Sequence, residues 1–122
     1  AMDHHLWEKY KLAEMFHVTD VNTNMPAKKN PFWKPAPGTY KFPGIGPVSI
    51  GINELQESGV QFVVCGAAIT VYSAVAAGNN ADAATVKNEW MAGVLPGIHV
   101  VPSGVWAVGR AQEKGCAYCF VR

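Results

Sequence analysis

Two short apolar runs in the second half of the chain have the length of buried strands. They are residues 60–64 (VQFVV) and residues 98–101 (IHVV). Each leads through a glycine-containing turn into a helix-like segment, an apolar one at 67–77 and a mixed one at 104–114. Buried strands that alternate with helices are typical of parallel β-sheets whose faces are covered by helices. The pattern therefore predicts two strand–turn–helix units.

Two more elements complete this half of the chain. Asp82 is placed to cap a helix over residues 82–91, and residues 116–121 have the composition of a third strand. The resulting order is strand, helix, helix, strand, helix, strand. That order predicts a parallel α/β sheet with right-handed crossovers.

The first half of the chain is less regular. The spacing of apolar residues predicts an amphipathic helix over 3–16 with Asp3 near its N-cap. Six of the eight prolines fall within residues 17–47, which we expect to form one long irregular loop. A second helix is predicted over 48–58, with Gly59 ending it in the left-handed conformation. So long a loop suggests a functional segment or a missing packing partner.

Length and composition limit the possible classes of protein. The 122 residues are enough for one domain, 1–122, and 49% of them are hydrophobic. A net charge of +1 gives no general attraction to nucleic acid or anionic membranes, and no apolar run is long enough to span a bilayer. No secretory leader pattern is visible, so we expect a cytoplasmic protein or the processed remainder of an exported, periplasmic one.

The long loop contains lysines interleaved with aromatic residues. The chain has no acidic residue between Asp20 and Glu54. This composition fits a loop that binds an anion or a partner, and equally a solvated loop anchored to the core by its aromatic side chains. Without arginines or a phosphate-binding glycine motif, it does not indicate a nucleic-acid or nucleotide site. We expect no cofactor.

Cys65 is the main candidate for chemistry. It stands between the strand 60–64 and the helix 67–77, where backbone N–H groups without partners and the positive end of the helix dipole favour thiolate over thiol. Gly66 and Ala67 belong to the same turn and would supply N–H donors. The alternative interpretation is a small buried core cysteine.

The second strand–helix turn contributes Ser103 and Gly104, with Ser103 as the expected N-cap. Cys116 and Cys119 have redox or metal-like spacing, but a zinc site needs two further ligands, so we expect no metal. In an extended strand these two cysteines would be about 10 Å apart, too far for a disulfide. Thiol–disulfide exchange there would require a turn.

The chain resembles the DsrE/DsrF-like sulfur-relay family, in particular its longer, often exported single-domain branch. The stretches that carry this resemblance are 6–12, 30–32, 59–66, 95–98, 101–104 and 111–118. The resemblance implies a three-layer α/β/α sandwich with a flavodoxin-like parallel sheet, which here lacks the first two strands of the family. It also implies a homo-oligomer, a trimer or larger, and a persulfide carried on Cys65.

Two functions follow as hypotheses. In the first, Cys65 accepts sulfur from a donor protein and passes it to an acceptor, as a carrier or sulfurtransferase. In the second, the fold is retained as a non-catalytic oligomeric binding or assembly module. The family's missing strands would leave 60–64 as an apolar sheet edge. We expect another copy of the chain or the proline-rich loop to cover it.

Overall fold

The structure is a computed structural model that describes residues 1–121. It divides into two units. The first comprises residues 1–62 and 92–97, and the second comprises residues 63–91 and the chain from 98 onward. Within the described residues, no helix combines the length and the apolar character that crossing a bilayer requires.

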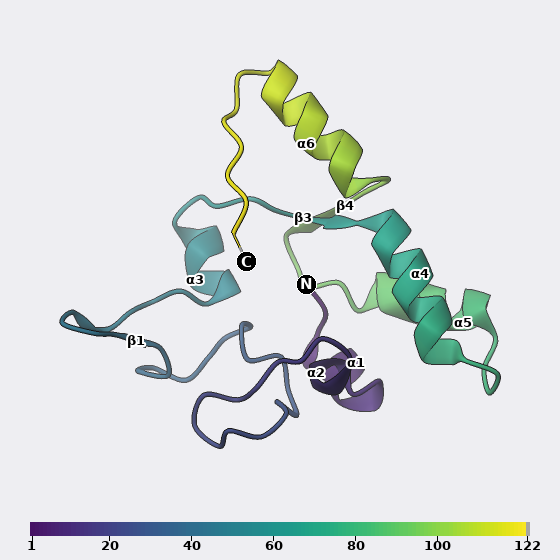
Figure 1. The fold of residues 1–122 in the computed structure, drawn as a ribbon, viewed down its shortest axis with the longest axis horizontal. Coiled ribbons are helices and arrows are strands. Elements are labelled where there is room, and N and C mark those ends of the chain that lie inside the picture. Colours follow the sequence, from purple (N-terminus) through teal and green to yellow (C-terminus); the bar gives the residue numbers. More distant parts are fainter. Residues whose placement is uncertain (122) are drawn as a thin grey trace. The chain divides into compact units, whose positions relative to one another are not determined.

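The second unit contains the predicted strand–turn–helix pairs. Strand β3 (Phe62–Cys65) leads into α4 (Gly66–Ala77), and β4 (Ile98–Val101) leads into α6 (Gly104–Glu113) (Figure 1). Helix α5 (Ala83–Ala92) lies between the two pairs in the sequence. Strands β3 and β4 form a parallel two-stranded sheet. The mixed α/β character and the parallel pairing are therefore confirmed.

The predicted third strand is wrong. Residues 116–121 form no strand and pair with neither β3 nor β4. Helix α6 ends at Glu113 with Lys114 as its C-cap, and Gly115 then reverses the chain with a φ of +93°. Phe120 and Val121 are both mostly exposed. An apolar composition makes a strand only where the segment pairs with a sheet, and residues 116–121 pair with neither β3 nor β4.

Helices α4 and α5 each bury one stripe of side chains. In α4 the stripe is Ile69, Ser73 and Ala77, spaced four residues apart, and in α5 it is Val86 and Trp90. This spacing brings the side chains onto one face of each helix. The start of α5 is fixed as predicted, because the Oδ2 atom of Asp82 accepts a hydrogen bond of 3.0 Å from the backbone N–H of Thr85.

In the first unit, the single helix expected over residues 3–16 is two short ones. Helix α1 (His4–Lys9) begins at Asp3, whose Oδ1 accepts a 2.8 Å bond from the N–H of Leu6. Helix α2 (Leu12–Met15) follows Lys11, which has a left-handed φ of 49°. In an unbroken helix Leu12 would lie about 120° around the axis from Leu6. The break allows both leucines to be buried, each 1% exposed.

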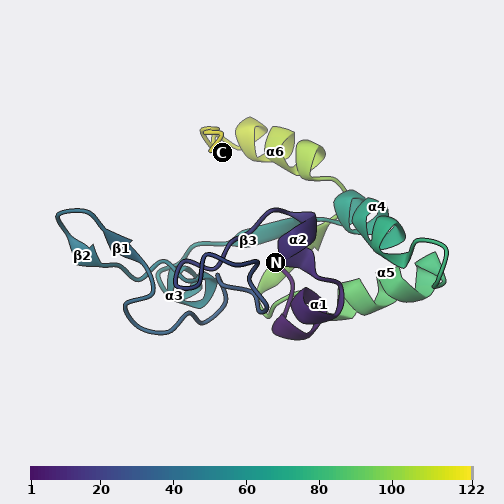
Figure 2. The ribbon, with the colours of Figure 1, turned by 60° about the horizontal axis from the view of Figure 1, so that its bottom comes forward.

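The proline-rich loop is irregular, as expected, apart from one small hairpin. Strands β1 (Lys41–Phe42) and β2 (Gly46–Pro47) pair in antiparallel fashion (Figure 2). The loop is anchored by the buried Asn30, whose Nδ2 donates a 2.6 Å bond to the carbonyl of Met2. Its Oδ1 accepts a 2.9 Å bond from the N–H of Phe32. A buried polar side chain with both groups bonded fixes the path of a loop that has few apolar anchors.

Helix α3 (Ile52–Glu57) begins four residues later than predicted. The N–H of Val48 bonds to the carbonyl of Tyr40 at 2.9 Å, which draws Val48 into the hairpin instead of the helix. The carboxylate of Glu54 then caps the helix by accepting a 2.8 Å bond from the N–H of Gly51. Gly59 follows the helix with a φ of +98°, as predicted.

Candidate functional site

Cys65 occupies the junction between a strand and a helix. It is the last residue of β3 and the N-cap of α4, with extended backbone angles (φ −77°, ψ 115°). Its Sγ accepts a hydrogen bond of 3.4 Å from the backbone N–H of Ala68, in the first turn of α4. The thiol is half-buried and free. The sulfur is therefore neither sealed in the core nor held in a disulfide.

The strand–helix turn that follows β4 lies against the turn that contains Cys65. A Cβ atom placed on Gly104 would lie 3.3 Å from the Cβ of Cys65 and 3.8 Å from its Sγ. Ser103 caps α6, because its Oγ accepts a 3.4 Å bond from the N–H of Trp106. Parallel neighbouring strands end at the same edge of a sheet, which is why the two turns meet there.

Gly66 and Ala67 bind the two turns together through the backbone. The N–H of Ala67 donates a 3.2 Å bond to the carbonyl of Pro102. A Cβ on Gly66 would lie 3.1 Å from the carbonyl oxygen of Val101, closer than side chains ordinarily approach. The structure thus brings five of the predicted site residues together: Cys65, Gly66, Ala67, Ser103 and Gly104.

Backbone amides set the acidity of the thiol. The N–H of Gly104 makes the largest contribution to lowering the pKa of Cys65, and the N–H of Ala68 makes the next. Partial burial acts in the opposite direction, and the N–H of Ala67 adds a further lowering. The net result is a pKa below the ordinary value of the thiol. A lowered pKa at an accessible sulfur is the property that makes a cysteine a nucleophile near neutral pH.

Cys116 and Cys119 are separate from this cluster of site residues. Both thiols are exposed and free, and they follow the C-terminal end of α6, whereas Gly104 stands at its N-terminal end. Ten helical residues span about 15 Å. The sequence-based argument that Cys116 and Cys119 lie too far apart for a disulfide assumed an extended strand. It does not apply, because residues 116–121 are not a strand. Exchange between the two thiols stays a prediction.

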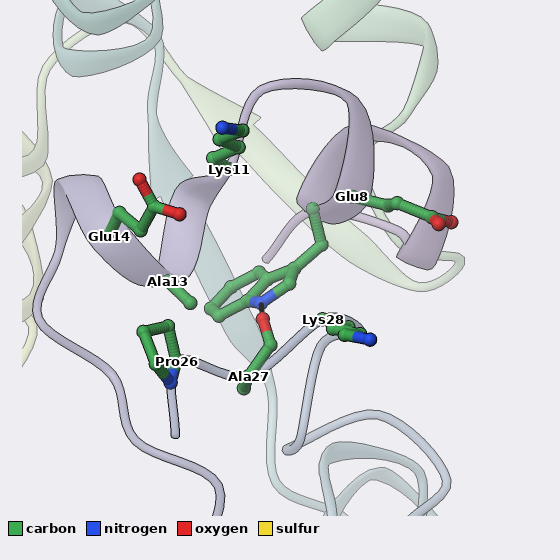
Figure 3. A pocket seen from close by; sticks show the side chains of 8 residues that line it. Glu8, Lys11, Ala13, Glu14, Pro26, Ala27 and Lys28 are labelled. Atoms are coloured by element: carbon green, nitrogen blue, oxygen red, sulfur yellow. Dashed lines mark hydrogen bonds between the residues drawn. The ribbon is translucent and has the colours of Figure 1, made fainter.

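Pockets were not predicted from the sequence, and those described lie in the first unit. One is lined by residues of α1, α2 and the segment 26–28, and a second by residues between Asp20 and Pro31. Neither lining includes Cys65. Within residues 1–121, no group of three or more histidine, cysteine, aspartate or glutamate side chains is arranged to hold a metal ion. The first pocket combines residues 7–14 with residues 26–28 (Figure 3), so no local motif could have indicated it.

Comparison of the chain with family models, with curated proteins and with solved structures finds no match.

Proposed function

We propose that this protein is a sulfur carrier of the DsrE/DsrF-like type, in which Cys65 holds sulfane sulfur as a persulfide. One observation carries the proposal: amides from two strand–helix turns lower the pKa of one half-buried thiol. The groups that lower the pKa are backbone N–H donors, with no charged side chain among them. Such donors stabilise anionic sulfur without placing a permanent counter-charge beside it.

The transfer balances without an external oxidant or reductant. The Cys65 thiolate attacks the terminal sulfur of a donor persulfide, R–S–SH. The new bond is Cys65 S–S, and the bond between the two donor sulfurs breaks with its electron pair leaving on R–S⁻. An acceptor thiolate then attacks the terminal sulfur of Cys65–S–SH and releases the Cys65 thiolate. A low pKa of Cys65 favours both steps. In the first step it increases the fraction of Cys65 present as the attacking thiolate, and in the second step it makes the Cys65 thiolate a better leaving group.

The proposal extends to fold and assembly. The parallel pair β3–β4 with its helices would be part of a three-layer flavodoxin-like sandwich. Among the described residues, β3 pairs with β4 alone, and Val63 within it is 58% exposed. Apolar strands of this kind are usually covered on their faces and edges. A homo-oligomer, a trimer or larger, would provide that cover.

Loading with sulfane sulfur tests the proposal. A variant carrying Cys116→Ser and Cys119→Ser leaves Cys65 as the only thiol. After exposure to a persulfide donor, its intact mass is expected to increase by one sulfur atom, and a low-molecular-weight thiol should remove that sulfur. The matched triple variant, which adds Cys65→Ser, should gain nothing. Equal masses for the two proteins after loading would refute the proposal.

The second candidate function is a non-catalytic assembly module, and α6 favours it. This helix has no buried residue, and even its apolar side chains face solvent: Val105 is 87% exposed and Trp106 is 59% exposed. On α4, Val71 and Val75 are also mostly exposed. Exposed apolar side chains in such number are typical of an interface. Multi-angle light scattering, combined with the mass experiment, distinguishes the two hypotheses. An oligomer whose Cys65 takes up no sulfur supports the assembly module alone. A monomer at micromolar concentration contradicts the assembly module.

A further inference from the structure

The β3–β4 sheet is incomplete in a single chain. Within residues 1–121, β3 and β4 pair only with each other, so each strand has one free edge. None of their eight residues is buried. Parallel sheets are normally covered on both faces, and an isolated pair of strands is marginally stable in water. The sheet therefore offers an edge at which a further strand would add stability.

Strand β4 is the more accessible of the two. His99 and Val100 within it are both exposed, and successive side chains of a strand point to opposite faces of the sheet. In β3 only Val63 is exposed. Strand β4 also contains no proline, no lysine or arginine and no acidic residue, which are the residues that commonly protect a free edge from pairing. Its edge is therefore open to a neighbouring strand.

Residues 116–121 have the properties of a strand that lacks a partner. They leave the end of α6 as an extended trace (Figure 1) and contain no proline, glycine or charged residue. Tyr118, Phe120 and Val121 are 58%, 70% and 81% exposed, and aromatic and β-branched side chains favour strands. Exposed segments of this composition tend to pair with the edge of another sheet.

The chain does not use this segment itself. The N–H of Cys116 donates a 3.0 Å bond to the carbonyl of Ala111 and so closes the end of α6. Among the described residues, no backbone hydrogen bond joins 117–121 to the rest of the chain. Pairing with β4 of the same chain would need α6 to lie across the sheet as a crossover helix. Neither α6 nor β4 has a buried residue, so this helix does not bury its own sheet.

We propose that residues 116–121 of one copy add as a third strand to the free edge of β4 in a second copy. Six extended residues span about 20 Å, which is enough to cover the roughly 13 Å of a four-residue strand. Neither segment carries a lysine, arginine or acidic residue, so the pairing leaves no charge without a partner. The interface is that of the homo-oligomer proposed above and rests on that proposal, but it is independent of sulfur transfer at Cys65.

The geometry of this contact determines the kind of assembly. The donor segment and the acceptor edge are different parts of the chain, so the contact is heterologous. Repeated addition in one direction closes a ring or continues as a fibre. Main-chain hydrogen bonds would supply the affinity, and the side chains of Tyr118 and Phe120 would lie on one face of the enlarged sheet.

Prolines in the donor segment test the pairing. Ala117→Pro with Tyr118→Pro removes two consecutive N–H groups, one of which must face the partner strand. Multi-angle light scattering under reducing conditions should show an oligomer for the unmodified chain and at least about tenfold weaker association for this variant. Both positions are exposed and lie beyond α6, and circular dichroism checks that the helices are retained.

The matched control is Ala117→Thr with Tyr118→Thr, which keeps both N–H groups and favours a strand. This variant should remain oligomeric. Dissociation of both variants to the same extent would overturn the proposal, because side-chain contacts would then explain the assembly. An oligomer that the prolines leave intact would also overturn it, although the homo-oligomer itself would stand. A monomeric unmodified chain would refute both, and sulfur loading of Cys65 is measured separately.

Cross-linking between two different chains locates the edge. In the donor chain Cys119 is the only thiol, and in the acceptor chain all three native cysteines are serine and His99→Cys supplies the only thiol. A short bismaleimide should join the two chains severalfold more efficiently than when the acceptor thiol comes from Asn80→Cys, in the exposed turn after α4. Equal yields from positions 80 and 99 would overturn the proposal. So would linkage confined to a single chain that carries both thiols.

Discussion

Gly104 lies against Cys65 so closely that a methyl group on it would come within 3.8 Å of the sulfur. The two residues are almost forty positions apart in the sequence, yet the amide of Gly104 contributes most to lowering the pKa of the Cys65 thiol. The contact exists because β3 and β4 are parallel neighbours and each passes directly into a helix. The low pKa of the Cys65 thiol therefore depends on both strand–helix turns, the one after β3 and the one after β4.

Gly104→Ala is expected to raise the pKa of Cys65 toward its ordinary value. The added methyl would lie 3.3 Å from the Cβ of Cys65, so one of the two turns must shift and the strongest N–H donor moves with it. At pH 7 the thiolate fraction, and with it the rate of alkylation by iodoacetamide, should fall severalfold.

Gly109→Ala is the matched control for this variant. Gly109 belongs to the same helix, α6, and a Cβ there would meet nothing within 4 Å. Its alkylation rate should equal that of the unmodified chain. If Gly104→Ala also leaves the rate unchanged, the amide of Gly104 does not set the acidity of the thiol.

The pH dependence of stability provides a separate test of the lowered pKa. Between the folded pKa of Cys65 and the unfolded value of about 8.5, the unfolded state binds more protons at this thiol than the folded state does. The free energy of unfolding should therefore rise with pH across that window, and this contribution should disappear as pH falls through the folded pKa. Urea unfolding of the unmodified chain and of Cys65→Ser, at matched pH values, isolates the contribution. A difference that decreases with rising pH would mean that folding raises the pKa.

Trp7→Phe should lower the free energy of unfolding by about 1–3 kcal/mol, the usual cost of leaving a buried polar group without its partner. The substitution keeps an aromatic ring but removes the 2.7 Å bond from the indole Nε1 to the carbonyl of Ala27. Both residues are buried, at 6% and 4% exposure, so water replaces the lost donor poorly. Chemical denaturation measures the change. A loss below about 0.5 kcal/mol, typical of a surface substitution, would show that this bond does not hold the loop to α1.

Two glycine substitutions of the same chemistry should have opposite effects on stability. A Cβ on Gly93 would come within 2.7 Å of the Cγ of the buried Leu6, so Gly93→Ala should destabilise the chain by about 1–3 kcal/mol. Gly109→Ala adds a methyl in open space inside α6 and should stabilise by about 0.5–1 kcal/mol. Thermal unfolding of the two variants compares them directly. A Gly93→Ala variant as stable as the unmodified chain, or more stable, would contradict the close packing of Gly93 against Leu6.

Local signals in the sequence were sufficient for the elements that hold the site. An apolar run followed by Cys65-Gly66, and another followed by Ser103-Gly104, predicted β3, α4, β4 and α6 close to their observed bounds. The capping roles of Asp82 and Ser103 were also predicted correctly. These features depend on the chemistry of a few consecutive residues, which a single sequence contains.

Features that depend on distant partners could not be predicted in this way. Residues 116–121 have the composition of a strand, but a strand also needs a pairing partner, and composition does not reveal whether the segment pairs with a sheet. The left-handed Lys11 that separates α1 from α2 carries no local signal, since a lysine in that conformation is uncommon. The pocket around Trp7 joins the first helix to Ala27, twenty residues further along the chain.

The most direct test of the account is the rate of alkylation of Cys65 as a function of pH. It is measured in the chain carrying Cys116→Ser and Cys119→Ser, so that Cys65 is the only thiol. The paired turns predict a half-maximal rate at a pH clearly below 8.5, the value for an unperturbed cysteine, and a return to that value after denaturation in urea. A half-maximal rate at or above 8.5 in the folded chain would contradict the assignment of Cys65 as a reactive thiolate.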